Sequence, residues 1–185
     1  RGRAMAAQMR QGNLGKGNPW RLAVWGTAAG LLLLPAIAMQ LGVEGVLWTA
    51  FDFIVMGVLL AAACGAYEVA VRMSGSSAYR LGFALAIVLG FLLVWINLAV
   101  GIIGDEDNMA NAVFAGVLLV AAIGALLGQL QSAGMARAMV ATGIAQLLAG
   151  SYALALGSME GGMLSGAFAA LWLTSAALFH KAARQ

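Results

Sequence analysis

The chain has few charged residues. Only 9% of its 185 residues are Asp, Glu, Lys or Arg, whereas 63% are hydrophobic. Soluble proteins average about a quarter charged residues and under a half apolar ones, and a soluble domain of this length could not bury so much apolar surface. The composition therefore argues against a soluble enzyme and a free nucleic-acid-binding domain, despite a net charge of +3. It also excludes a disordered chain and suits a lipid bilayer.

Cysteine and histidine each occur once, as Cys64 and His180. A single cysteine cannot form an internal disulfide bond, and a single histidine cannot ligate a haem from both faces or build a multi-histidine metal site. The serines of Ser74–Ser77 have no histidine or lysine beside them in the sequence to activate a nucleophile. We therefore expect no cofactor and no enzymatic activity, and an enzyme that acts on lipid is the least favoured interpretation.

Long apolar runs dominate the sequence instead. Runs of about 20 apolar residues are typical of membrane-spanning helices, and six such runs are present. The predicted fold class is all-α, a compact bundle of six transmembrane helices in residues 19–181. A basic tail (residues 1–18) precedes the bundle and a short tail (residues 182–185) follows it. The predicted spans are Trp20–Gln40, Leu47–Val71, Leu81–Ile103, Ala112–Leu130, Ala136–Leu156 and Gly161–Phe179.

The charged residues sort by membrane side when six spans are assumed. Every Lys and Arg falls at one set of span ends, and every acid except Asp52 and Glu68 falls in a loop or helix cap at the other. The positive-inside rule then predicts that both termini of this multi-pass protein are cytoplasmic. We expect Arg10 and Lys16 of the basic tail to contact anionic lipid headgroups or a partner protein, and not nucleic acid.

Charges within the spans are the first functional candidates, because ionisable groups are costly inside a membrane. Asp52 follows Thr49 by three residues, the spacing of a helix-capping box, so we expect a cap, with an ion or partner contact as the alternative. Glu68 precedes Arg72 by four residues, an order that favours a structural ion pair on one helix. The central part of the six spans has no ionisable residue, which argues against an ion-coupled transporter.

An acidic loop, Asp105–Glu106–Asp107–Asn108, separates the third and fourth spans. Three carboxylates and an amide could supply oxygen ligands to a hard cation, but their spacing is not that of a complete calcium loop. Acids near helix N-termini are also favoured by the helix dipole. Three interpretations therefore stay open: helix capping and topology, a contact between these four residues and a partner protein, and a weak cation site at Asp105, Glu106 and Asp107.

Glycine and alanine recur at four-residue spacing within several spans. Small residues allow close helix approach in lipid, where the hydrophobic effect does not drive association. We expect these faces to pack inside the bundle or against other membrane protein subunits. The positions are Gly26 and Gly30; Gly57, Ala61 and Gly65; Gly82, Ala86 and Gly90; and Gly124 and Gly128.

Five tryptophans lie in or beside the predicted spans. Indole rings are enriched at membrane interfaces. We therefore expect anchoring, and not ligand stacking, for Trp20, Trp25, Trp48, Trp95 and Trp172.

Several segments resemble a family of uncharacterised bacterial inner-membrane proteins. The main one is Val94–Asn108 (VWINLAVGIIGDEDN), and the likeness covers most of residues 44–184. Members of that family usually carry proline after the acidic-loop asparagine, where this chain has Met109. The resemblance implies a small polytopic membrane protein and no particular activity. The other similar segments are Phe51–Phe53, Ala66–Glu68, Gly134–Ala138 and Ala170–Ala183.

Two functions fit this sequence. The first is a non-catalytic accessory or stabilising subunit of a larger membrane complex, such as an energy-transducing one, which works through helix and loop contacts. The second is a small transporter or channel for a neutral or weakly polar solute. That alternative predicts a continuous polar path lined by Asn97, Thr142, Gln146 and Tyr152.

Overall fold

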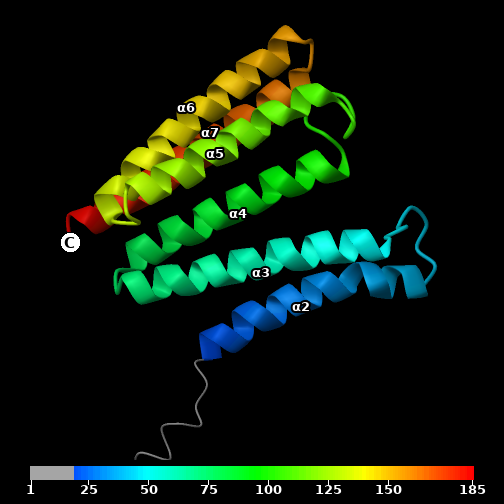
Figure 1. The fold of residues 1–185 in the computed structure, drawn as a ribbon, viewed down its shortest axis with the longest axis horizontal. Coiled ribbons are helices and arrows are strands. Elements are labelled where there is room, and N and C mark those ends of the chain that lie inside the picture. Colours follow the sequence, from blue (N-terminus) through cyan, green and yellow to red (C-terminus); the bar gives the residue numbers. More distant parts are fainter. Residues whose placement is uncertain (1–18) are drawn as a thin grey trace, which may run out of the picture. The chain divides into compact units, whose positions relative to one another are not determined.

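The structure, a computed structural model, describes residues 19–185. Within these residues all regular structure is helical, and six helices are long and apolar enough to cross a membrane (Figure 1). The predicted all-α fold class and six spans are confirmed, while the basic tail with Arg10 and Lys16 lies outside the described residues. The helices are α2 (Pro19–Gln40), α3 (Ala50–Met73), α4 (Ser77–Ala99), α5 (Ala112–Leu127), α6 (Ser132–Ala155) and α7 (Met159–Ala183), with a short 3₁₀ helix, η1 (Met109–Asn111), before α5.

Most helix ends differ by a few residues from the predicted spans, because caps and not hydropathy decide where a helix begins. α4 begins ahead of the predicted start at Leu81, since the hydroxyl of Ser76 accepts a hydrogen bond from the Tyr79 N–H. α7 continues to Ala183, into the segment predicted as a tail. Its last turn is basic, and positive charge there is stabilised by the helix dipole.

The chain divides into two compact units, residues 1–68 and 69–185. The first unit holds α2 and most of α3, which form a hairpin joined by residues 41–49. A Cβ on Gly57 of α3 would lie 3.8 Å from Cδ2 of Leu32 of α2, an ordinary packing distance. In the connection, Gly42 and Gly45 have φ angles of 69° and 83°, which side chains other than glycine rarely adopt.

The second unit is built from α4 to α7. α6 packs extensively on α7, and further contacts join α4 to α7 and α5 to α6 (Figure 1). Aromatic rings lie at the contact between α4 and α7. The ring centroids of Tyr79 and Phe179 are 5.2 Å apart in an edge-on arrangement. Trp172 is also fully buried in this unit. It is a core residue, so the prediction that it anchors the helix at the membrane interface is wrong.

Glycines produce the closest helix approach in the second unit. A Cβ on Gly124 of α5 would lie 2.8 Å from the Cβ of Ala138 of α6. A Cβ on Gly134 of α6 would lie 2.5 Å from the Cα of Gly128, at the end of α5. Neither position has room for a side chain, so these residues allow the backbones to meet as small residues do in membranes.

Charges of opposite sign occupy opposite ends of the second unit. Successive helices run in alternating directions, so α4 and α6 begin at the end where α5 and α7 finish (Figure 1). This arrangement agrees with the charge sorting expected from six spans. The basic end carries Arg80, Arg137, His180, Lys181 and Arg184, and the acidic end carries Asp105, Glu106, Asp107 and Glu160.

Candidate functional site

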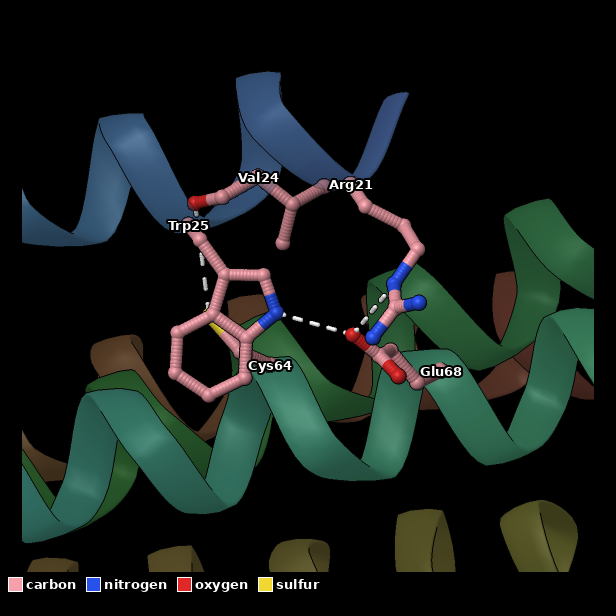
Figure 2. Close-up of polar contacts among 5 residues, drawn as sticks. All are labelled: Arg21, Val24, Trp25, Cys64 and Glu68. Carbon is pink, nitrogen blue, oxygen red and sulfur yellow. Dashed lines mark hydrogen bonds and ion pairs between the residues drawn. The ribbon is translucent and has the colours of Figure 1, made fainter. Parts of the chain in front are cut away.

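A polar cluster joins the two helices of the first unit around the carboxylate of Glu68 (Figure 2). Its Oε1 accepts hydrogen bonds from Arg21 Nε at 3.0 Å and from Trp25 Nε1 at 2.9 Å. The side chain of Glu68 is 18% exposed, whereas that of Arg21 is 59% exposed. Arg21 and Trp25 are one helical turn apart on α2, so both reach the same carboxylate. The cluster therefore ties the charged ends of α2 and α3 together.

The cysteine lies one turn before Glu68, on the same side of α3. Cys64 is a buried free thiol, and its Sγ lies 4.0 Å from the carbonyl oxygen of Val24. Figure 2 shows it directed at α2 beside the Trp25 ring. A buried thiol in such surroundings behaves as a small apolar side chain. Cys64 thus belongs to the packing of the hairpin.

Two partners of Glu68 lie on α2, a helix that the sequence did not connect with this carboxylate. The expected partner was Arg72 of the same helix, and that pair stays a prediction. Arg21 and Trp25 were missed, because the sorting of charges by membrane side does not reveal contacts between helices and Trp25 was expected to anchor the helix at the membrane interface. Their four-residue spacing was the available signal, since it places both donors on one face of α2.

Thr49 and Asp52 form the hydrogen bonds that their spacing predicts. Asp52 Oδ2 accepts from the Thr49 backbone N–H at 2.7 Å and from the Thr49 hydroxyl at 2.8 Å. In return, the Asp52 N–H donates to Thr49 Oγ1 at 3.4 Å. Because α3 begins at Ala50, these bonds close its first turn, as a capping box does. The cap accounts for Asp52 without a bound ion.

The acidic loop has a well-defined backbone that an asparagine holds in place. Asn111 Oδ1 accepts from the N–H groups of Ile102 at 3.0 Å and of Ile103 at 2.8 Å. Its Nδ2 donates to the Asp105 carbonyl at 2.7 Å. Asn111 is only 8% exposed, and the sequence analysis did not single it out. The signal was its position at the start of the fourth span, three residues after Asn108, where an amide can bond the incoming loop.

Two further features shape this loop. Gly101 has a φ angle of 72°, and a Cβ there would collide with the Asp105 carbonyl and the Asn111 side chain. Ser158, just before α7, donates from its hydroxyl to the Ile102 carbonyl at 3.3 Å. The loop is therefore attached to the connection between α6 and α7.

The side chains of Asp105, Glu106 and Asp107 are exposed. Asn108 is also exposed and caps η1, because its Oδ1 accepts from the Ala110 N–H at 3.0 Å. In residues 19–185, no group of three or more His, Cys, Asp and Glu side chains is placed to hold a metal ion. The loop thus offers a fixed, negatively charged surface, and the cation interpretation gains no support from the geometry.

The polar side chains expected to line a transport path lie in separate environments. Asn97 and Thr142 each donate to a carbonyl four residues earlier in their own helix, at 2.7 and 2.8 Å. Gln146 Nε2 donates to the hydroxyl of Ser165 at 3.3 Å, whereas Tyr152 is 45% exposed. Only Thr142 and Gln146 share a buried face. The structure therefore does not bring the four side chains into the continuous path that a channel predicts.

The predicted small-residue positions differ in how closely they are packed. A Cβ on Gly82 of α4 would lie 3.2 Å from the Cβ of Leu178 on α7, a tight contact. Gly57 and Gly90 make ordinary contacts, each with a leucine at 3.8 Å. Ala61 is exposed, and Gly65 and Ala86 are partly buried.

Gly26 and Gly30 of α2 are the open pair. Within residues 19–185, nothing lies within 4 Å of the place where either Cβ would be. Val24 and Leu32, which do contact α3, lie on the other side of α2 at 100° per residue. The glycine pair therefore faces away from α3.

Comparison with protein-family models, curated proteins and solved structures finds no match for this chain. The class of protein therefore follows from the fold, a helical protein with six helices suited to crossing a membrane. The resemblance of Val94–Asn108 to bacterial inner-membrane proteins stays a prediction.

Proposed function

We propose that this chain is a non-catalytic subunit of a larger complex in the bacterial inner membrane, which it stabilises through helix contacts. The observation that supports this most strongly is the open face of α2. In the most apolar 18-residue stretch of each helix, 6% of the residues of α2 are buried, against 44% of those of α6. Within the first unit α3 covers only one side of α2, and the other side is available to lipid or to another protein.

The glycine pair favours a protein on this face. Glycine inside a helix is about 1 kcal/mol less favourable than alanine, and contact with lipid does not offset this cost. Contact with a second helix does offset it, because the backbone of that helix can approach α2 closely over two glycines one turn apart. Gly26 and Gly30 have this spacing and are exposed. We therefore assign the docking of a partner helix to this face.

The acidic loop supplies a second contact in this proposal. Its backbone is already ordered by Asn111, so a partner loses little conformational freedom of the loop on binding. The carboxylates of Asp105, Glu106 and Asp107 are suited to basic groups of that partner. With the basic end in the cytoplasm and both termini on that side, this contact is periplasmic.

Co-purification tests the proposal. The full chain is extracted from native membranes in a mild detergent without crosslinker, and its mass is measured by native mass spectrometry. We expect a complex with at least one other membrane protein. The double variant Gly26→Leu, Gly30→Leu should keep its helical circular dichroism but retain the partner at least tenfold less.

The matched control is the double variant Thr27→Leu, Ala29→Leu. Both positions are exposed, and each lies about 100° round the helix from one of the glycines. The control should retain the partner as the unmodified chain does. A stable lone monomer from the unmodified chain, or equal loss in both double variants, would refute the proposal.

A further inference from the structure

A shallow groove of about 690 Å³ runs between α6 and α7 in the second unit. Its floor is made of small residues, among them Ala136 and Ala176, which are nearly buried. Val140, Ile144 and Leu173 form its walls. The volume is within the range of about 300–1,000 Å³ that is typical of small-molecule sites.

The groove follows α6 from the first turn of this helix. It extends from Ala133 to Ile144, about 16 Å at the helical rise of 1.5 Å per residue. Beyond Arg137 its lining is apolar for about 10 Å, which is shorter than one leaflet of a hydrocarbon core about 30 Å thick. The groove can therefore hold part of one acyl chain within a single leaflet.

Polar groups line the groove only toward the basic end of the second unit. Apart from Arg137 and His180, every residue that lines it is apolar, and both of these side chains are exposed. A guanidinium stays charged at any physiological pH and bonds phosphate oxygens in pairs. An imidazole donates at least one N–H in either protonation state. The groove thus combines an anion-binding end with an apolar length.

We propose that this groove binds an anionic phospholipid, with one acyl chain along the groove and the headgroup phosphate between Arg137 and His180. An amphiphile with a negative charge at one end and an acyl chain at the other matches both features. A partner helix would continue across the membrane, beyond the end of the groove. This lipid site is separate from the face of α2 assigned above, since it lies on other helices.

Native mass spectrometry of the delipidated full chain tests the site, with phosphatidylglycerol and phosphatidylcholine of identical acyl chains as probes. We expect one tightly retained phosphatidylglycerol and at least fivefold weaker retention of phosphatidylcholine. A charge-assisted hydrogen bond from a guanidinium to a phosphate oxygen requires direct contact and contributes about 1 kcal/mol or more, a factor of at least about five. Arg137→Gln should therefore weaken phosphatidylglycerol binding at least fivefold.

Two controls separate the site from general attraction to positive charge. Lys181→Gln removes the same charge at the same end of the unit but outside the groove, and it should leave binding unchanged. Ala141→Trp fills the groove without changing charge and should abolish binding, whereas Leu147→Trp, at an exposed position of α6 outside the groove, should not. Equal binding of the two lipids, equal effects of Arg137→Gln and Lys181→Gln, or unchanged binding in Ala141→Trp would overturn the proposal.

Discussion

The two units use the same kind of residue in different ways. In the second unit, Gly124 and Gly128, in and at the end of α5, bring α5 and α6 so close that no side chain would fit. In the first unit, Gly26 and Gly30 have the same small size and four-residue spacing, yet open space surrounds them within the described residues. Small-residue spacing therefore indicates the ability to pack closely, but does not reveal whether the partner is the same chain.

Replacing glycine by alanine should have opposite effects in the two units. Gly134→Ala would force a methyl group against the backbone of Gly128, and overpacking of this kind costs about 1–3 kcal/mol or more. Gly30→Ala adds a methyl group in open space and should stabilise α2 by up to about 1 kcal/mol. Unfolding in detergent, followed by far-ultraviolet circular dichroism, measures both free energies. A similar loss of stability in both variants would contradict the distinction between closed and open faces.

A loss of stability comparable to that of Gly134→Ala is expected at the loop of the second unit. Asn111→Ala would leave the N–H groups of Ile102 and Ile103 without their acceptor, and each unsatisfied buried group costs about 1–3 kcal/mol. Hydrogen exchange at these two amides should speed up more than at any amide of α6. Asn108→Ala, which removes a single bond to Ala110, is the control and should have the smaller effect. Unchanged protection in Asn111→Ala would show that the loop is held in another way.

The polar cluster of the first unit should contribute least to stability, because the side chain of Arg21 is 59% exposed to solvent. A double-mutant cycle with Arg21→Gln and Glu68→Gln measures the pair directly. We expect a coupling of about 1 kcal/mol or less, the value typical of exposed ion pairs. The same cycle with Trp25→Phe in place of Arg21→Gln measures the other bond to Glu68. Zero coupling in both cycles would mean that the cluster does not hold α2 to α3.

Local signals could be predicted from the sequence, and contacts between distant segments could not. Hydropathy was sufficient to predict six spans, because a run of about 20 apolar residues is typical of a membrane-spanning helix. The Thr49 and Asp52 cap was also predictable, since both partners lie within one helical turn. The bonds of Glu68 to Arg21 and Trp25 cross between helices, and spacing along one helix contains no information on which face meets which neighbour.

The acidic loop and Trp172 illustrate the same limit. The role of Asn111 depends on the path of the chain through Gly101, where a side chain would collide with the Asp105 carbonyl that Asn111 bonds. Trp172 is buried because it faces the interior of the second unit. Composition shows that a tryptophan is present in a span, but only the packing of the helices decides whether it faces lipid or protein.

The central claim, that another protein covers the glycine face of α2, is tested most directly by photocrosslinking in intact membranes. A photoreactive phenylalanine analogue is placed at Gly30, and in a control chain at Leu148, an exposed position of α6. We expect a discrete adduct with a second polypeptide from position 30 and no such adduct from position 148. Reaction with lipid alone at position 30 would contradict the claim.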